Sequence, residues 1–209
     1  MTTICPTITA VDEKTYNLQL DLVEKFAKRL HVDLADGLFA SRLVNVKKIK
    51  KSSVRTDFHI MYENPGLVLD DVFKLKPSLI IVHFESDVNI SKVLAYVKSQ
   101  NIKFGIAILQ HTPVSKIKFL LKDLDHVLVF SGHLGSFGGI ADLNLLEKIK
   151  KIKSANTNLE IGWDGGINGS NIRQLVDAGV DVLNVGGYIS RSDDPREAYN
   201  TLTGLVGKN

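Results

Sequence analysis

The sequence contains a single cysteine, Cys5, and no apolar run long enough to cross a membrane. One cysteine cannot form an internal disulfide, which excludes the disulfide-stapled secreted folds. The missing apolar run excludes a membrane-spanning helix, and the first residues lack the basic and apolar stretches of a secretory signal. We therefore expect a cytoplasmic protein with no membrane partner, in which Cys5 is a buried reduced thiol without a role.

An excess of one charge is also absent, because 26 basic side chains stand against 23 acidic ones, for a net charge of +3. The lysines are spread along the chain, whereas nucleic-acid binding needs a concentrated basic patch. The charge pattern therefore predicts no nucleic-acid partner. It leaves open whether the mild positive bias serves a small anionic substrate or only hydrates the surface.

No proline- and serine-rich linker and no low-complexity stretch interrupts the chain. Its 209 residues, 44% of them hydrophobic, are enough for one sizeable core and too few for two. We therefore predict one domain over residues 1–209.

Short β-rich apolar runs alternate with amphipathic segments along the whole chain. This alternation indicates a parallel sheet, and eight strand–helix units in roughly 200–250 residues fit a closed barrel. The glycine fingerprint of an open dinucleotide-binding sheet does not follow the first strand. The predicted fold is therefore α/β, a single (β/α)8 TIM barrel. The predicted strands are Ile4–Ile8, Arg29–Leu34, Thr56–Met61, Leu79–Phe84, Phe104–Leu109, His126–Phe130, Leu159–Trp163 and Val180–Val185, with helical patterns at Glu13–Arg29 and Leu143–Lys153.

Polar side chains gather at the carboxyl ends of three predicted strands, which is where chemistry collects in this fold. Because side chains alternate across a strand, His31 and Asp33 point to the same side. His59 in the third strand and Asp164 after the seventh bring a second imidazole and a second carboxylate to the same rim. This mixed set suits Zn²⁺, Fe²⁺, Mn²⁺ or Co²⁺ better than Ca²⁺ or Mg²⁺. We therefore predict one divalent metal ion, of open identity, held by His31, Asp33, His59 and Asp164.

Glycine-containing turns follow the last three predicted strands. A missing side chain lets backbone N–H groups approach an anion closely, and loops after the last two strands of such barrels often bind phosphate. Each turn alone is weak evidence, but their convergence on one rim predicts a phosphate cradle. The residues are Ser136, Phe137, Gly138 and Gly139 after the sixth strand, Gly165 and Gly166 after the seventh, and Gly186 and Gly187 after the eighth.

An ordered set of motifs over nearly the whole chain resembles the pentulose-phosphate 3-epimerases, the ribulose-phosphate 3-epimerase family. The resemblance implies a ribulose-phosphate-binding barrel with the same four metal ligands, and it makes Asp33 and Asp164 the acid/base pair on opposite faces of the substrate. It adds Thr7, His59 and Met61 to the substrate-binding residues. The motifs are Pro6-Thr7, His31-Val32-Asp33, Asp57-Phe58-His59-Ile60-Met61, His83-Phe84-Glu85, Phe137-Gly138-Gly139, Asp164-Gly165-Gly166 and the run from Gly186 to Arg196.

The implied reaction inverts carbon three of a ketose phosphate, interconverting D-ribulose 5-phosphate and D-xylulose 5-phosphate in the pentose phosphate pathway. Removing a proton beside a ketone requires stabilisation of the developing enediolate oxygen and a base close to that proton. Inversion then requires a second acid on the opposite face. The expected partner is a small phosphorylated sugar, and a homo-oligomer is left open.

The chain departs from the family pattern over the metal, where three methionines are usual. Met61 matches one of them, whereas Ala35 and Phe130 stand at the other two positions. Either apolar bulk is all that this cap needs, or the substrate is altered. Trp163 replaces a smaller residue beside Asp164, and its side chain is expected to point away from the rim.

The remaining titratable residues receive smaller roles. His83 and Glu85 match the family and are interpreted as residues that orient ligands or pack. His133 is left out of the site, and the pattern shows no partners for His111 and His126.

Two alternatives stay open at the level of sequence. One is a 3-epimerase for another ketose phosphate, such as a ketohexose 6-phosphate, because the cap is substituted. The other is a catalytically inactive metal-binding barrel with a regulatory or binding role, against which the retention of all four ligands argues.

Overall fold

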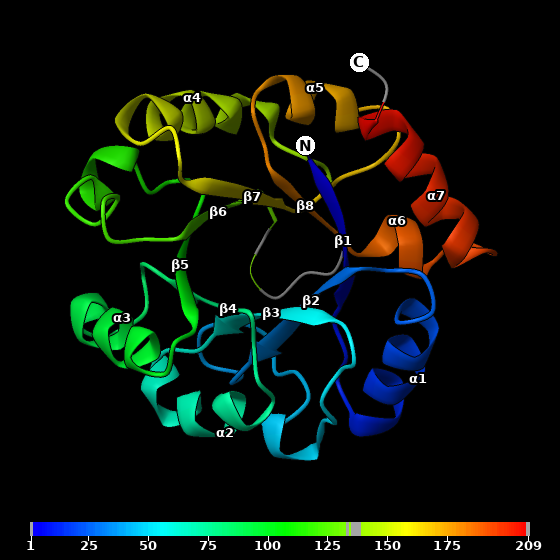
Figure 1. Ribbon diagram of the computed structural model, residues 1–209, viewed down its shortest axis with the longest axis horizontal. Coiled ribbons are helices and arrows are strands. Elements are labelled where there is room, and N and C mark those ends of the chain that lie inside the picture. Colours follow the sequence, from blue (N-terminus) through cyan, green and yellow to red (C-terminus); the bar gives the residue numbers. More distant parts are fainter. Residues whose placement is uncertain (1, 133, 135–138, 208–209) are drawn as a thin grey trace.

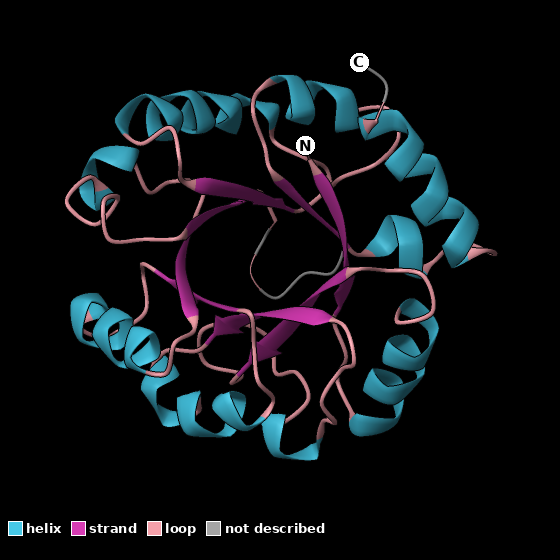
Figure 2. Ribbon diagram, viewed as in Figure 1, coloured by secondary structure: helices cyan, strands magenta, loops and turns pink. Residues whose placement is uncertain are grey.

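Eight parallel strands pair in chain order and close into a barrel in which β8 lies beside β1. The computed structural model describes residues 2–132, 134 and 139–207. Figures 1 and 2 show the strands as an inner ring enclosed by the helices. The predicted (β/α)8 barrel is confirmed. The strands are β1 (Thr3–Ile8), β2 (Arg29–Ala35), β3 (Arg55–Met61), β4 (Leu79–His83), β5 (Lys103–Ile108), β6 (His126–Phe130), β7 (Glu160–Asp164) and β8 (Val182–Val185).

The helical layer is uneven. Between β2 and β3 and between β5 and β6, segments that the structure describes throughout, the chain forms only the 3₁₀ turns Val46–Lys48 and Val114–Ile117 in place of an α-helix. None of the helices in the described part of the chain combines the length and the apolar composition that a membrane crossing needs. The helices are α1 (Glu13–Val23), α2 (Leu69–Lys74), α3 (Ile90–Ser99), α4 (Leu146–Ala155), α5 (Ile172–Asp177), α6 (Gly187–Ser190) and α7 (Pro195–Val206).

Local chemistry sets the ends of α1. The Asp12 carboxylate accepts a hydrogen bond from the Thr15 N–H at 2.8 Å, which satisfies one of the free N–H groups of the first turn. The helix ends at Val23 and not at Arg29 as predicted, since the chain forms turns at residues 24–26 and Arg29 already begins β2. The apolar pattern of the sequence continues past Val23, so the pattern alone does not indicate where the helix ends.

Strand side chains alternate between two environments. Those that face outward pack beneath the helices in the main core, where Trp163 and Phe104 are fully buried. Those that face inward form a small apolar cluster within the barrel, made of Leu79, Ile81, Ala107 and Leu128. Inward-facing positions near the carboxyl ends of the strands carry the polar residues of the candidate site.

A charged network occupies the interior at the amino ends of the strands. Arg29 Nε lies 2.5 Å from the Asp57 carboxylate, and its two terminal nitrogens donate to the Glu160 carboxylate at 2.8 Å each. His126 Nδ1 lies 2.8 Å from the same carboxylate. The prediction that His126 lacks partners is therefore wrong, because the parallel register places it beside Glu160. Mutual pairing is what permits these groups to be buried.

Candidate metal and substrate site

Two imidazoles and two carboxylates converge inside the barrel at the carboxyl ends of β2, β3 and β7. Donor atoms of His31, Asp33, His59 and Asp164 all lie within 4.8 Å of one another. Asp33 Oδ1 is 3.1 Å from His59 Nδ1 and 3.3 Å from His31 Nε2. Asp164 Oδ2 is 3.8 Å from each of the same two nitrogens. All four residues of the predicted ligand set therefore meet at one point.

This arrangement fits a divalent cation. Among the described residues, neither ring nitrogen of the fully buried His31 has a hydrogen-bond partner. A buried polar atom without a partner is costly, and coordination by Nε2 would satisfy one of the two. Two imidazoles with two carboxylates are a donor set that suits borderline divalent metals. The set could thus hold one such ion through His31 Nε2, His59 Nδ1 and one oxygen of each aspartate.

The pKa values of the two neighbouring aspartates are shifted in opposite directions. Burial opposes the charge on Asp33, but its close contacts with the His31 and His59 imidazoles outweigh this effect and hold the pKa of Asp33 below its usual range. Burial, and then the charge of Asp33, raise the pKa of Asp164 to about 7. Burial also lowers the pKa of His59 to about 3, so that this ring is neutral. A bound cation would lower the pKa of both carboxyls further, and paired acids of unequal strength are typical of proton-transfer sites.

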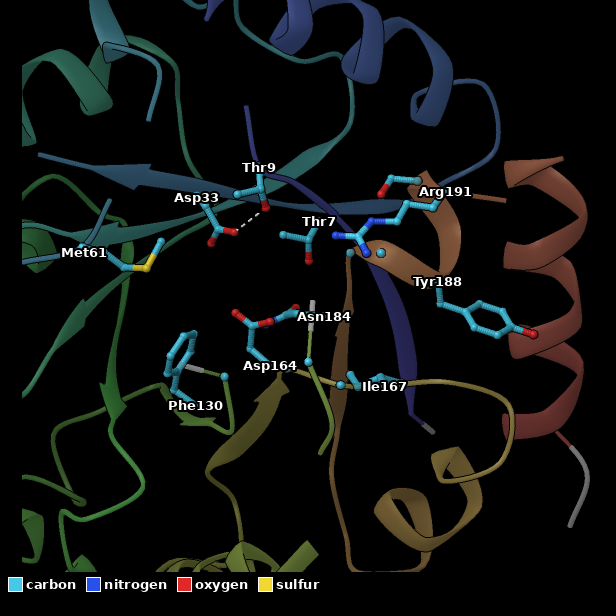
Figure 3. Close-up of a pocket in the computed structure, with 18 of the residues that line it drawn as sticks. Thr7, Thr9, Asp33, Met61, Phe130, Asp164, Ile167, Asn184, Tyr188 and Arg191 are labelled. Atoms are coloured by element: carbon cyan, nitrogen blue, oxygen red, sulfur yellow. Dashed lines mark hydrogen bonds between the residues drawn. The ribbon is translucent and has the colours of Figure 1, made fainter. Parts of the chain in front are cut away.

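Asp33 is held in place from β1 as well. The hydroxyl of Thr9, directly after β1, donates to Asp33 Oδ2 at 2.7 Å, as the dashed line in Figure 3 shows. One oxygen of the carboxylate is therefore oriented by Thr9, while the other faces the imidazoles. This division leaves little rotational freedom to the Asp33 side chain.

The turn after β7 is set by close backbone contacts. Gly165 and Gly166 have φ angles of +110° and +71°, which side-chain-bearing residues rarely adopt. A Cβ atom on Gly166 would stand 2.0 Å from the Ala141 nitrogen. The Trp163 indole donates to the Gly165 carbonyl at 3.0 Å from within the outer core, which confirms that its side chain points away from the rim.

A cavity of about 630 Å³ opens at the carboxyl ends of the strands. In Figure 3, Asp33 and Asp164 point toward each other from opposite walls, with Met61 and Phe130 to one side. Arg191 lies at the other side. The cavity thus has a reactive end and a cationic end, and the two glycine pairs after β7 and β8 line it as well.

Apolar side chains cover the reactive end despite the substitutions in the cap. Leu43 packs with Ala35 and Met61 in one buried cluster, and its N–H donates to the Ala35 carbonyl at 3.2 Å. The Phe130 ring lies 5.9 Å from the His59 ring, measured between centroids. Leu43, from the loop after β2, therefore packs beside Ala35 in this cover.

The cationic end is built around a glycine. The guanidinium of Arg191 lies over Gly187, so that a Cβ at position 187 would be 3.7 Å from its Cζ and Nε atoms. Gly187 and Arg191 belong to one turn, because the Arg191 N–H donates to the Gly187 carbonyl at 3.1 Å. In Figure 3 the guanidinium points toward Thr7.

The structure brings the described members of the predicted site together. His59 is buried among the ligands, and Ser136, Phe137, Gly138 and His133 lie outside the described residues. Thr7, Met61, Gly139, Gly165, Gly166, Gly186 and Gly187 line the cavity.

Sequence reasoning missed several residues of the cavity wall, among them the polar Thr9, Asn184 and Arg191. Thr9 follows Thr7 with the period of two that a strand imposes, and this signal could have identified it. Asn184 is a buried amide in an apolar strand and has no hydrogen-bond partner among the described residues, so its polarity was the available signal. Nothing in the local pattern distinguishes Arg191 from a surface arginine.

Comparison with known proteins agrees with this geometry. Residues 3–190 match the model of the ribulose-phosphate 3 epimerase family. The chain is 34% identical to the ribulose-phosphate 3-epimerase of Helicobacter pylori (strain ATCC 700392 / 26695), over 95% of each chain. It is 28% identical to the enzyme of that name from Bacillus subtilis (strain 168), over 98% of this chain and 99% of the other.

Solved structures with low sequence identity share the fold. The 3-hexulose-6-phosphate synthase of Salmonella typhimurium superposes with a TM-score of 0.75 at 13% identity, covering 98% of both chains. The 3-keto-L-gulonate-6-phosphate decarboxylase of Vibrio cholerae O1 superposes with a TM-score of 0.74 at 10% identity, covering 98% of this chain and 97% of the other. At such identities the likeness concerns the barrel alone.

Proposed function

The chain belongs to the ribulose-phosphate 3-epimerase family, and from this membership we propose that it interconverts D-ribulose 5-phosphate and D-xylulose 5-phosphate by inverting carbon three. One observation carries the proposal: Asp33 and Asp164 face each other at a shared group of imidazole nitrogens. Two carboxyl groups on opposite walls can reach the two faces of one carbon between them, which inversion requires.

Proton transfer is the work of the two aspartates. One carboxylate removes the proton from carbon three, the electron pair moves into an enediolate with the neighbouring ketone, and the other carboxyl returns a proton to the opposite face. The unequal acidities of Asp33 and Asp164 support this division into base and acid. When bound, a divalent metal would supply Lewis-acid stabilisation of the enediolate oxygens.

The shape of the cavity supports one direction of substrate binding. Carbon three would lie between Asp33 and Asp164, beneath the apolar cover of Met61 and Phe130, which limits the access of water. The phosphate would lie at the other end, against the glycine turns and Arg191. A single elongated site then binds the anion and the reacting carbon separately.

The alternatives make different demands on this site. A larger ketohexose phosphate was suggested by the substituted cap, but Leu43 packs against Ala35 there, which argues against an enlarged pocket. An inactive binding protein has no need for two opposed carboxyls, one of which is oriented by Thr9. The cytoplasmic location, the single domain over residues 1–209 and any homo-oligomer stay predictions.

The test is hydrogen exchange at carbon three in heavy water. With Zn²⁺, Fe²⁺, Mn²⁺ or Co²⁺ supplied, the chain should exchange this hydrogen of ribulose 5-phosphate and produce xylulose 5-phosphate, and a chelator should stop both. Exchange only with a hexulose 6-phosphate would favour the other substrate, and no exchange with either would favour an inactive barrel.

Asp164→Asn tests the roles of the aspartates in the same assay. The amide cannot transfer the proton, so epimerisation should fall by about 10²–10⁴-fold, while the metal is retained by the other ligands. Asp177→Asn is the matched control, because Asp177 is an exposed carboxylate at the end of α5 that pairs with Arg173. Near-normal turnover in Asp164→Asn would refute its role.

A further inference from the structure

A line of side chains leads from the predicted metal ligand His59 through His83 to Glu85. The His59 ring presents Nδ1 to Asp33, while its Nε2 lies 2.9 Å from His83 Nε2. His83 Nδ1 in turn lies 3.4 Å from Glu85 Oε2. His59 and His83 are both fully buried, so water does not reach the contact between their rings.

Glu85 is fixed at the far end of this line as an acceptor. Its Oε1 accepts hydrogen bonds from the Leu109 N–H, at 3.1 Å, and from the Thr112 hydroxyl. The Lys148 ammonium group holds the same loop by donating to the carbonyls of Leu109 and Thr112 at 2.7 Å each. A carboxylate only accepts hydrogen bonds, so the contact between Glu85 Oε2 and His83 Nδ1 is favourable when His83 Nδ1 carries a hydrogen.

The number of protons along the line limits its hydrogen bonds to two orders. A neutral imidazole carries one N–H, and two ring nitrogens 2.9 Å apart share a single hydrogen, donated either by His59 or by His83. Asp33 Oδ1 also lies 3.3 Å from His31 Nε2, which can donate to it, whereas His83 is the donor beside Glu85 Oε2. This difference favours the order in which His83 Nδ1–H donates to Glu85 and His83 Nε2 is left with a lone pair. His59 must then donate from Nε2, which leaves its Nδ1 with a lone pair facing Asp33 and Asp164.

We propose that His83 and Glu85 are positioning residues that fix His59 in the tautomer protonated at Nε2, so that Nδ1 is ready to hold a divalent cation. The competing tautomer, with a proton on Nδ1 donated to Asp33, would turn a lone pair of His83 toward the Glu85 carboxylate. The inference rests on the proposed function in taking His59 as a metal ligand, and it adds the residues that prepare that ligand.

The surroundings of His83 restrict its ring as well. The Phe39 ring lies 4.8 Å from the His83 ring and the Phe130 ring lies 5.5 Å from it, between centroids. These contacts oppose rotation of His83 about its side-chain bonds. Because the His83 ring keeps its position, the hydrogen bond that His83 donates to Glu85 determines which nitrogen of His59 carries the proton.

Glu85→Gln tests this order. The Leu109 N–H and the Thr112 hydroxyl require the amide oxygen, which turns the amide NH₂ toward His83 Nδ1. Every hydrogen bond along the line then reverses and the His59 proton moves to Nδ1. Long-range ¹H–¹⁵N correlation spectra of the metal-free protein report the tautomer directly, with the His59 signals identified by their loss in His59→Asn.

We expect the proton on Nε2 in the wild-type chain and on Nδ1 in Glu85→Gln, with Zn²⁺ affinity in a competition titration weakened by about 10- to 100-fold. Glu147→Gln, which alters an exposed carboxylate on α4, should change neither quantity. If Glu85→Gln does not fold, His83→Phe should retain the ring packing, abolish the single tautomer and weaken Zn²⁺ binding.

Two results would overturn the proposal: a wild-type His59 protonated on Nδ1, or a folded Glu85→Gln chain with wild-type tautomer and affinity. A wild-type chain that binds no Zn²⁺ would instead contradict the metal dependence of the proposed function, because the tautomer is measured without metal.

Discussion

Arg191 brings a guanidinium group to the end of the cavity away from Asp33 and Asp164. The group lies beside Gly187, where a Cβ atom would make ordinary van der Waals contact with it. A guanidinium is always charged and forms bidentate contacts with phosphate oxygens. At the residue scale, Arg191 therefore adds a positive charge beside the glycine turns of the proposed phosphate cradle.

Arg191→Met should weaken substrate binding without altering the chemistry. A hydrogen bond to a charged group contributes about 1.5–3 kcal/mol, so KM should rise by about 10- to 150-fold while kcat changes little. Steady-state kinetics with ribulose 5-phosphate measure both constants. Arg173→Met is the control, since Arg173 is a half-exposed residue of α5, and an unchanged KM in Arg191→Met would exclude phosphate binding by this side chain.

Residues of the site differ in how far the sequence predicted them. His31, Asp33 and His59 follow the strand period of two, so one strand and its neighbour already placed them on one side. Arg191 directly follows the short helix α6, and the direction of its side chain toward Thr7 depends on how it packs against the rest of the barrel. Such complementarity between side chains is a property of packing and is not visible in local spacing.

At the scale of elements, the turn after β7 packs closely against residues of the segment that follows β6. The backbone after β7 has positive φ angles at Gly165 and Gly166, and it passes so close to residues 132 and 141 that a side chain has no room. The carboxylate of Asp164 is thereby fixed relative to the neighbouring loop. The Asp-Gly-Gly motif predicted a tight turn, but the loop against which it packs is distant in sequence.

Gly166→Ala should destabilise the fold substantially. The new methyl group would overlap the backbone of Ile140 and Ala141, and overpacking of this kind costs about 1–3 kcal/mol, to which the strained φ angle adds. Gly204→Ala is the matched control, because Gly204 lies within α7 with no atom near its Cβ position, and alanine there should stabilise by about 0.5–1 kcal/mol. Urea titrations give both values, and equal effects of the two substitutions would contradict the steric argument.

The strands were predicted to within two residues at each end because alternation and apolar runs define them well. The segments that connect the strands were harder to predict. The 3₁₀ turns Val46–Lys48 and Val114–Ile117 stand where regular strand–helix alternation predicts full helices. Their short length depends on how the chain must return to the next strand, which is set by the closed barrel and not by propensity.

In the part of the chain that the structure describes, the molecule has polar groups at both ends of its interior, and the predicted metal-ligand set lies at the carboxyl ends of the strands. At the amino ends of the strands, Arg29 is saturated by the carboxylates of Asp57 and Glu160. Burial opposes ionisation of Glu160, but hydrogen bonds from Arg29 and His126 outweigh it and lower the pKa of Glu160. The charged groups of this network pair with one another, so we interpret it as a contribution to the stability of the fold.

Acid should weaken the barrel partly through Glu160. A carboxyl with a lowered pKa in the folded state stabilises above its unfolded pKa of about 4.3 and loses this contribution as the pH falls below that value. Glu160→Gln should therefore be less stable than the wild type at neutral pH and should lose less stability on acidification. Urea titrations at neutral pH and at about one pH unit below the unfolded pKa measure the difference. Parallel losses in the two chains would contradict the role of Glu160.

Leu43 supplies from a loop the bulk that Ala35 does not supply from β2. Part of the cover over the cavity therefore comes from a loop, whereas His31 and Asp33 come from β2. Substitutions at position 43 can change the shape of this cover while both predicted metal ligands stay in place. Related barrels with this division of parts could diverge in the sugars that they accept and still keep the proposed chemistry.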